Sequence, residues 1–486
     1  MSREPPWTET TLGKIAKWGS GGTPSRRNPE FFKGSIPWIK TGELGKKYIQ
    51  NCEEYISEEA ICRSSAKLFK KGSVGIAMYG ATIGKLSIFD IDASTNQACA
   101  VAEPKEGLDK EFLYYFLLSE RRSLIKAGKG GAQPNISQSI LKDWPIRLPT
   151  ISEQKNIVAK IEALFSELDK GIESLKTARQ QLKAYRQAVL KHAFEGKLTE
   201  KWRQQNPDKL ESPEQLLARI QQEREQCYQR QLEEWKQDVK AWEDNGKEGK
   251  KPSKPKLNSA IRPLEDNALL SLPDGWVWVE LSTIIENIQI GPFGSLLHKA
   301  DYVADGVPLV NPSHIKNQKV APDWNLTVTE EKLNGLRKYV MQSNDIVIGR
   351  RGEMGRCAVI TNKESGWLCG TGSLFVRPLS IANSDFYSWI ITSQRVKDHL
   401  SNSSIGTTMQ NLNEKILKGI PVPVCSIEEQ DEIIRQISSQ YSAIDKLEEE
   451  IDAQIMKSET LHQSILKKAF CGQITKDKSS IVGKEF

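Results

Sequence analysis

The chain has 486 residues, with 68 lysine and arginine residues against 62 aspartate and glutamate residues, a formal net charge of +6. This length predicts two or more domains, because one hydrophobic core rarely organises so many residues. No apolar run approaches the roughly 18 residues that a membrane helix needs, and the first residues, MSREPPWTET, predict no signal peptide. Eight cysteines without a C-x-x-C pair and only five histidines disfavour a zinc site and predict reduced thiols in a cytoplasm.

The first 150 residues read as a mixed α/β module, because short apolar runs alternate with Gly, Pro and Asn turns before a helix predicted over Glu111–Lys126. The stretch YGATIGKLSI (79–88) resembles a phosphate-binding loop. However, Tyr79 occupies the position of the first loop glycine, and Leu86 replaces the hydroxyl that would hold Mg²⁺. We therefore expect no nucleotide site there. The predicted strands are Ile36–Ile39, Val74–Met78, Leu86–Phe89 and Ala98–Ala102.

A long helix is predicted to follow this first module. Its apolar residues keep the a and d spacing of a coiled coil over about 40 residues, which would span roughly 60 Å. A single amphipathic helix of this kind more often packs on a core, but a second, matching helix later in the chain favours a paired coiled coil. The apolar positions of the first helix are Ile157, Ile161, Leu164, Leu168, Leu175, Leu182, Tyr185 and Val189.

The next segment begins with a helix-start pattern. Ser212 is a candidate N-cap, Pro213 stands at the first helical position, and Gln215 would close a capping box. The helix is predicted to end near Asn245–Gly246. The stretch GKEGKKPSKPK (246–256) then predicts a solvated basic linker.

The remainder of the chain repeats the first part. Residues 133–199 align with 409–475 without a gap, and 21 of the 67 positions are identical. Upstream, IVIGRRGEMGRCAVI (346–360) repeats the shape of the 79–88 region, so that Gly352 and Gly355–Arg356 correspond to Gly80 and Gly84–Lys85. The apolar positions of the second long helix are Ile433, Ile437, Ile444, Leu447, Ile451, Leu461 and Ile465, and Gln440, Gln454 and Ser458 interrupt the pattern.

This order predicts how the two long helices pair. The first helix must carry the chain from one module to the other and the second must lead back, so they can pair along their length only if they are antiparallel. The predicted fold class is therefore α+β, with two α/β modules joined by a long antiparallel coiled coil and related by an internal pseudo-twofold repeat.

We found no catalytic motif. NPEF (28–31) approaches the N-P-P-[FY] motif of adenine methyltransferases, but Glu30 replaces the second proline and the preceding residues form no cofactor loop. Deaminase, nucleophile-elbow and nuclease patterns are missing as well. A catalytic centre would be expected to survive in at least one of the two copies, so we predict that the chain is not an enzyme, and has no catalytic or metal-binding residues.

Both modules instead carry polar, glycine-rich loops in matching positions. Glycine lets a backbone approach a ligand closely, lysine and arginine neutralise phosphates, and arginine, asparagine and glutamine read base edges. The loops are 39–48, 78–85 and 126–135 in the first module, and 310–319, 349–356 and 401–411 in the second. The candidate DNA contacts are Lys40, Lys46, Lys47, Tyr79, Lys85, Lys126, Lys129, Lys316, Lys319, Arg350, Arg351 and Arg356.

The layout resembles the specificity subunit of type I restriction–modification enzymes over nearly its whole length. The segments that show the resemblance most clearly are PIRLPTISEQKNIVAKIEALF with PVPVCSIEEQDEIIRQISSQY, and QAVLKHAFEGKLT with QSILKKAFCGQIT. The resemblance implies a non-catalytic subunit that is located in the cytoplasm of a prokaryote. Its two target-recognition domains would read an asymmetric, bipartite target in double-stranded DNA. The resemblance also implies that the helices dock two methyltransferase (modification) subunits and, through them, restriction subunits. S-adenosylmethionine, ATP and Mg²⁺ would belong to those partners, and no cofactor to this chain.

The resemblance gives the domain organisation. We expect target-recognition domain 1 at 1–150, a central helical region at 151–199, a helical extension and basic linker at 200–270, target-recognition domain 2 at 271–425, a C-terminal helical region at 426–475 and a tail at 476–486. The alternatives are a coiled-coil scaffold with two protein-binding modules, and an active methyltransferase, which the motif search disfavours. Binding to duplex DNA that weakens steeply with salt would distinguish a DNA reader from a scaffold.

Overall fold

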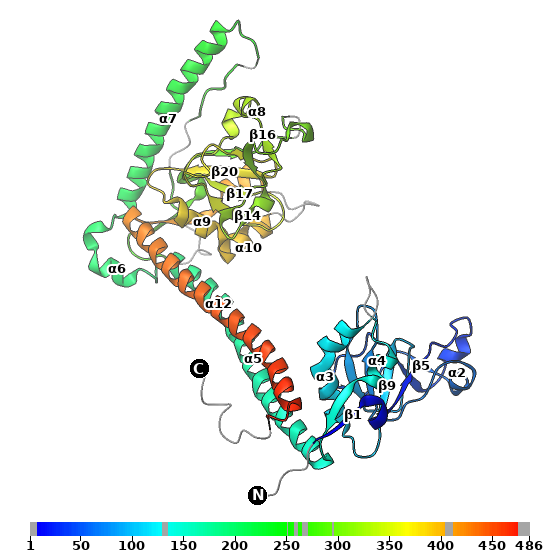
Figure 1. Cartoon of the computed structure of the whole chain (residues 1–486). Coiled ribbons are helices and arrows are strands. Elements are labelled where there is room, and N and C mark those ends of the chain that lie inside the picture. Colours follow the sequence, from blue (N-terminus) through cyan, green and yellow to red (C-terminus); the bar gives the residue numbers. More distant parts are fainter. Residues whose placement is uncertain are drawn as a thin grey trace. The chain divides into compact units, whose positions relative to one another are not determined.

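The structure is a computed structural model, and it describes residues 7–128, 135–249, 251–256, 261–264, 271–293, 296–403 and 412–474. The chain divides into two compact units (Figure 1). Unit 1 contains residues 1–178 and 450–486, and unit 2 contains residues 179–449. Each unit therefore combines one α/β module with segments of both long helices.

The module of unit 1, called module A, is built on two sheets. The larger sheet has the strand order β2-β9-β6-β7-β4, and the smaller one has the order β5-β3-β8. The four strands and the helix predicted for this module are present: β3 and β7 have the predicted bounds, and the ends of the other three elements are shifted by at most two residues. The strands are β1 (Thr8–Thr11), β2 (Ala16–Ser20), β3 (Ile36–Ile39), β4 (Tyr48–Ile49), β5 (Tyr55–Ile56), β6 (Val74–Ala77), β7 (Leu86–Phe89), β8 (Ser94–Thr95), β9 (Cys99–Pro104) and β10 (Pro145–Leu148), and the predicted helix is α3 (Lys110–Ala127).

Module B, in unit 2, repeats this plan. Its sheets have the orders β12-β20-β17-β18 and β16-β13-β19, and β11 pairs with β21 as β1 pairs with β10. The difference is a separate hairpin, β14-β15, where module A adds β4 to its larger sheet. The strands are β11 (Val277–Glu280), β12 (Ile285–Ile290), β13 (Val307–Val310), β14 (Ile315–Lys316), β15 (Lys319–Val320), β16 (Thr327–Val328), β17 (Ile346–Gly349), β18 (Cys357–Val359), β19 (Leu368–Cys369), β20 (Ser373–Pro378) and β21 (Pro421–Val424).

Shorter helices complete the modules and the segment between them. They are α1 (Leu12–Ile15), α2 (Glu58–Arg63), α4 (Gln138–Asp143), α6 (Glu200–Gln205), α8 (Glu330–Asn334), α9 (Ser384–Thr392), α10 (Gln394–Ser403) and α11 (Glu414–Lys418).

The glycine turn that suggested a phosphate-binding loop is a duplicated β-turn. Gly80 and Gly352 have φ angles of +79° and +83°, and Gly84 and Gly355 have φ angles of +74° and +78°. Each turn joins two antiparallel strands, β6 to β7 in module A and β17 to β18 in module B. The backbone is left-handed at two positions of each turn, which explains why glycine occupies these positions in both copies. The predicted correspondence of the two turns is confirmed.

The two long helices, α5 (Ile151–Phe194) and α12 (Ile427–Phe470), have 44 residues each and pair in opposite directions within each unit. In unit 1, Lys160 donates to the Ile474 carbonyl (3.1 Å), and further along α5 Asp169 lies 3.1 Å from His462. In unit 2, the hydroxyl of Tyr441 donates to the Arg186 carbonyl (3.1 Å). The residue numbers rise along one helix as they fall along the other, so the predicted antiparallel pairing is confirmed.

Each long helix begins directly after one module and ends in the core of the other. Near the end of α12, Ile465, Leu466 and Ala469 are buried among the residues of module A. The equivalent end of α5 contributes Val189, Leu190 and Ala193 to the core of module B. The repeated segments QAVLKHAF and QSILKKAF are therefore docking ends for the opposite module.

A Glu-Gln pair stands near the beginning of each long helix, Glu153–Gln154 in α5 and Glu429–Gln430 in α12. Each pair binds the helix to the module that precedes it directly. Gln154 is fully buried, accepts the backbone N–H of Asp109 (2.8 Å) and donates to the carbonyls of Gly107 and Pro149 (both 2.9 Å). Gln430 repeats these contacts with the N–H of Asn383 and the carbonyls of Ile381 and Cys425. One buried amide side chain thus satisfies three backbone groups in each module.

The glutamates of the two pairs differ in their surroundings. Glu153 is half-buried and accepts the indole N–H of Trp7 (2.9 Å), and Glu429 accepts that of Trp276 (2.9 Å). Glu429 is only 1% exposed, and it also accepts hydrogen bonds from Thr199 (2.7 Å) and Arg203 (2.6 Å). It therefore joins the segment after α5, the start of α12 and module B.

The a and d positions are buried unevenly. Ile157, Ile161, Val189, Ile433, Ile437, Ile444 and Ile465 are buried, and Leu164, Leu168, Leu175, Leu182 and Ile451 are partly buried. Tyr185, Leu447 and Leu461 are exposed, although the heptad pattern placed them in the helix seam. All the buried positions except Ile444 belong to the core of a module, because two helices alone enclose few of the side chains between them.

The predicted capping box at Ser212 is confirmed, and it opens α7 (Pro213–Asp244). The segment after α7 carries exposed lysines, as predicted for a solvated basic linker, and the structure adds contacts with α7. The exposed lysines are Lys247, Lys251, Lys254 and Lys256. The indole N–H groups of Trp235 and Trp242 donate to the carbonyls of Pro252 (3.1 Å) and Gly249 (3.3 Å). This part of the linker is therefore anchored to α7.

Candidate nucleic-acid interface

The topology of module A brings four polar loops to one edge of its larger sheet. Strands β2 and β6 both pair antiparallel with β9, so both end at the edge where β9 begins. Strand β7 starts at the same edge, and β4 pairs parallel with it. The loops that meet there are 21–24, 40–47, 78–85 and 96–98, and we call this set loop edge A.

Module B gathers the equivalent loops in the same way. Strands β12 and β17 end where β20 and β18 begin. Pro312 lies 3.2 Å from the position of a Cβ on Gly349 and 3.0 Å from one on Gly372, which places the loop after β13 at this edge too. The loops 291–293, 311–314, 350–356 and 370–372 form loop edge B.

Two candidate cations of module A are paired within the chain. Lys40 donates to Glu53 and Glu54 (both 3.0 Å), and these hydrogen bonds raise the pKa of its ammonium group. Lys47 pairs with Glu162 of α5; burial by itself lowers the pKa of Lys47, but this pairing outweighs it and the pKa is raised. Both lysines remain charged but are partly neutralised by carboxylates.

The other candidates of module A lie on or next to loop edge A. Lys46 is exposed, and Lys85 and Tyr79 are half-buried in their loops. Lys126 is exposed in the last turn of α3, whose Arg121 and Ile125 lie 3.0 Å from the position of a Cβ on Gly84. Lys129 lies outside the described residues, as do the 476–486 tail and most of the 401–411 loop.

The candidate arginines of module B have different roles. Arg356 donates to the Pro312 carbonyl (3.1 Å) and pairs with Glu353 (3.1 Å), so it supports the loop itself. Arg350 donates to the Leu412 carbonyl (3.0 Å), and burial together with the neighbouring charge of Arg351 lowers its pKa. Arg351 is exposed. An anion at this place would relieve the repulsion between the two guanidinium groups.

The remaining candidates, Lys316 and Lys319, are exposed on the β14-β15 hairpin. Its two turn residues, Asn317 and Gln318, both have left-handed backbone, with φ angles of +49° and +57°. This is the turn that two-residue hairpins favour, so the hairpin displays both lysines on a short, regular support.

Sequence reasoning missed two loops at each edge. The loops 21–24 and 96–98 in module A, and 291–293 and 370–372 in module B, carry no basic residue and were therefore not selected. The available signal was the glycine that follows the first strand of each larger sheet, Gly21 and Gly291. Its meaning depends on close backbone contacts that only the structure shows.

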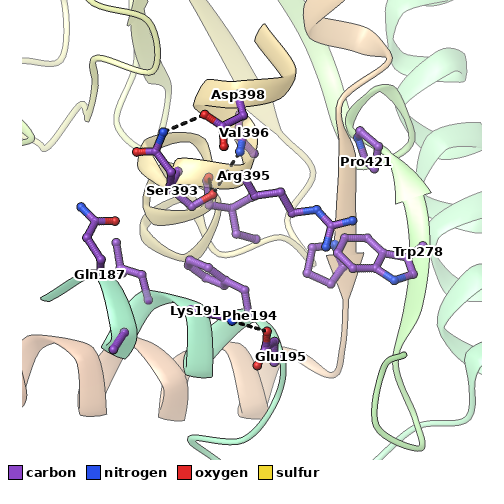
Figure 2. A pocket seen from close by; sticks show the side chains of 15 residues that line it. Gln187, Lys191, Phe194, Glu195, Trp278, Ser393, Arg395, Val396, Asp398 and Pro421 are labelled. Atoms are coloured by element: carbon purple, nitrogen blue, oxygen red, sulfur yellow. Dashed lines mark hydrogen bonds and ion pairs between the residues drawn. The ribbon is translucent and has the colours of Figure 1, made fainter. Parts of the chain in front are cut away.

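A cavity of about 630 Å³ in unit 2 lies where the end of α5 meets β11, β21 and the α9–α10 corner (Figure 2). Its lining is mainly apolar, and Arg395 lies over the ring of Trp278 at 4.6 Å. Lys191 lies 4.0 Å from Glu195 within this lining. None of its lining residues belongs to loop edge B, so it is separate from the candidate interface.

The described residues contain no group of three or more His, Cys, Asp or Glu side chains that could hold a metal ion. Within the same residues, no helix has the length and apolar character needed to cross a membrane. Taken with the repeated modules and the paired helices, the two loop edges define a two-module recognition protein.

Comparison with known proteins identifies the family. A family model described as the type I restriction modification DNA specificity domain matches residues 4–178 and 273–457. The EcoR124I/EcoR124II specificity subunit of Escherichia coli is 32% identical over 186 residues, which cover 36% of this chain and 46% of that protein. The EcoDI specificity subunit of Escherichia coli is 24% identical over 472 residues, covering 96% of this chain and 89% of that protein.

Two solved structures have the same fold. A chain from a study of complex assembly and conformational transition in the type I R-M system matches with a TM-score of 0.66 and 17% identity, over 97% of this chain and all of that one. The HsdS subunit from Thermoanaerobacter tengcongensis matches with a TM-score of 0.56 and 17% identity, over 97% and 98% of the two chains.

The matched segments make up more than half of the chain, which therefore belongs to the family of type I restriction–modification DNA specificity subunits. The predicted resemblance is confirmed. Specificity subunits are non-catalytic, and the catalytic activities of these systems are in partner subunits.

Proposed function

We propose that loop edges A and B each bind one half of an asymmetric, bipartite target in double-stranded DNA. The observation that carries this proposal is the recurrence of one sheet edge, with polar loops and exposed cations, in both modules of one chain. The side chains of the two edges differ, so the two half-sites are expected to differ in sequence. Lys46, Lys85 and Lys126 in module A, and Arg350 and Arg351 in module B, are the proposed phosphate contacts.

We further propose that the long helices dock two modification subunits, and through them restriction subunits. Each unit exposes a set of large apolar side chains on its helices: Met456, which is 65% exposed, and Leu461 in unit 1, and Tyr185 and Leu447 in unit 2. Such side chains are suited to contact another protein. One set in each unit agrees with two copies of one partner, which would bring S-adenosylmethionine and, with restriction subunits, ATP and Mg²⁺.

Binding of the assembled complex to its target is expected to weaken about a thousandfold or more between 50 and 200 mM salt, because phosphate contacts release counterions. Arg351→Gln should reduce the slope of log affinity against log salt by about 1. Fluorescence anisotropy with labelled duplex DNA measures both effects. Lys363→Gln is the matched control, because Lys363 is exposed in the turn after β18, at the opposite edge of the same sheet. Affinity that does not respond to salt would favour the scaffold alternative.

The purified chain, without partners, is expected to transfer no methyl group and to cut no DNA when supplied with S-adenosylmethionine, ATP and Mg²⁺. Radiolabelled methyl transfer and gel analysis of plasmid DNA measure the two activities. Adding the modification subunit to the same reaction provides the positive control. Methylation by the chain alone would contradict the assignment of catalysis to the partners.

A further inference from the structure

A short loop is fastened to the neighbouring turn at loop edge A. After β2, the N–H groups of Gly21 and Gly22 donate to the carbonyls of Cys99 (3.4 Å) and Thr95 (2.9 Å). A Cβ on Gly21 would lie 2.0 Å from the Thr95 oxygen, so only glycine fits there. The indole N–H of Trp38 donates to the Gly22 carbonyl (3.0 Å) from the other side. The loop therefore has little freedom to move relative to the 96–98 turn.

Module B fastens the equivalent loop in the same way. The N–H of Gly291 donates to the Ser373 carbonyl (3.0 Å), and a Cβ on Gly291 would lie 2.0 Å from the Gly370 oxygen. The next residue, Pro292, is buried. Two modules with different loop sequences thus share one close backbone approach, which presents the following side chain from a rigid support.

The exposed side chains on these two supports differ in chemistry. In module A, Thr23 and Gln97 are exposed, and the Thr23 hydroxyl donates to the amide oxygen of Gln97. Among the described residues, the amide nitrogen of Gln97 has no partner. In module B, Phe293 takes the place of Thr23 and is 61% exposed, and Thr371 takes the place of Gln97. One support offers hydrogen bonds, and the other offers an aromatic ring.

We propose that these two supports determine sequence specificity, which rests on the proposed function of the loop edges. Gln97, oriented by Thr23, donates through its amide nitrogen to N7 of a purine, and its oxygen keeps a lone pair for the N6 amino group of adenine. Phe293 contacts the C5-methyl group of a thymine. Phosphate contacts carry no sequence information, so the exposed cations position the DNA while these side chains distinguish its bases.

A rigid support is what this role requires. A side chain that reads a base edge must hold its donor within hydrogen-bond distance in a fixed direction. Binding also costs less when the loop is already ordered before the DNA arrives. The glycine approaches at Gly21 and Gly291 supply that order in both modules, although one carries a polar and the other an apolar side chain.

The test uses the complete chain assembled with its modification subunits and a DNA library in which both half-sites are randomised. Bound molecules are recovered and sequenced. Gln97→Ala is expected to reduce the preference at one position of the module A half-site roughly ten- to hundredfold, and to leave the module B half-site unchanged. Phe293→Ala is expected to reduce the preference at one position of the module B half-site and to leave the module A half-site unchanged. The untouched half-site is the internal control in each experiment.

Gln50→Ala provides a matched control, because Gln50 is exposed at the opposite edge of the same sheet and should change neither half-site. Unchanged preferences with Gln97→Ala and Phe293→Ala would overturn the inference. If Gln97→Ala abolishes all selection by module A, the Gln97→Glu variant distinguishes a base-reading role of this side chain from a structural one. A carboxylate only accepts hydrogen bonds, so a base reader should then favour cytosine at that position, and continued loss of all selection would overturn the inference. A wild-type complex that selects no bipartite site would instead contradict the proposed function.

Discussion

Glu429→Ala is expected to lower the free energy of unfolding of unit 2 by about 3 kcal/mol, because it leaves a largely buried guanidinium group without its carboxylate. Glu429 is 1% exposed and pairs with Arg203, whose side chain is 13% exposed. The change also removes the acceptor of Thr199 and of the Trp276 indole. The loss should appear in denaturant unfolding monitored by tryptophan fluorescence, since Trp276 is part of the site.

The neighbouring Glu428 gives a matched control. It is exposed in the same helical turn, so Glu428→Ala should cost less than about 1 kcal/mol. The double variant Glu429→Ala, Arg203→Met should recover part of the loss, because it also removes the unpaired charge. Equal stability of the Glu429→Ala and Glu428→Ala variants would show that the buried ion pair does not fasten the helix start to module B.

Inserting one heptad into α5 between Leu175 and Leu182, and one into α12 between Ile451 and Ser458, is expected to lengthen the gap between the two DNA half-sites by about three base pairs. Seven residues keep the a and d spacing and add about 10 Å to each helix. DNA rises about 3.4 Å per base pair. The half-site sequences should stay unchanged, because no loop residue is altered. Methylome sequencing of cells that carry the lengthened protein measures the gap.

An insertion in only one of the two helices is the control, because antiparallel helices of unequal length cannot remain paired along their whole length. It should abolish site-specific methylation without producing a longer gap. Three added base pairs also turn the second half-site by roughly 100° around the duplex, so weaker methylation is expected in the double insertion. An unchanged gap with intact methylation would show that the helices do not set the distance.

Sequence patterns were sufficient to predict those structural features that depend on neighbouring residues or recur in both copies of the repeat. The capping box at Ser212 needs only residues within one helical turn, and the glycines Gly80 and Gly352 mark the same turn in both copies. The heptads predicted two long helices, and the chain order predicted that they are antiparallel. A one-dimensional pattern carries this information, because helix periodicity and connectivity are themselves properties of the chain order.

Only the tertiary structure determined which partners the side chains of these patterns contact. The sequence marked the Glu-Gln pair as repeated, but only the fold shows that Gln154 and Gln430 each bind two backbone groups that lie 45 to 49 residues away, together with one that lies five residues away. Charge and composition selected Lys40 and Lys47, which the fold pairs with carboxylates. Gly21 and Gly291 looked ordinary, because a close approach between two backbones leaves no trace in either segment taken alone. Long-range contacts of this kind arise only when strands distant in sequence become neighbours in a sheet.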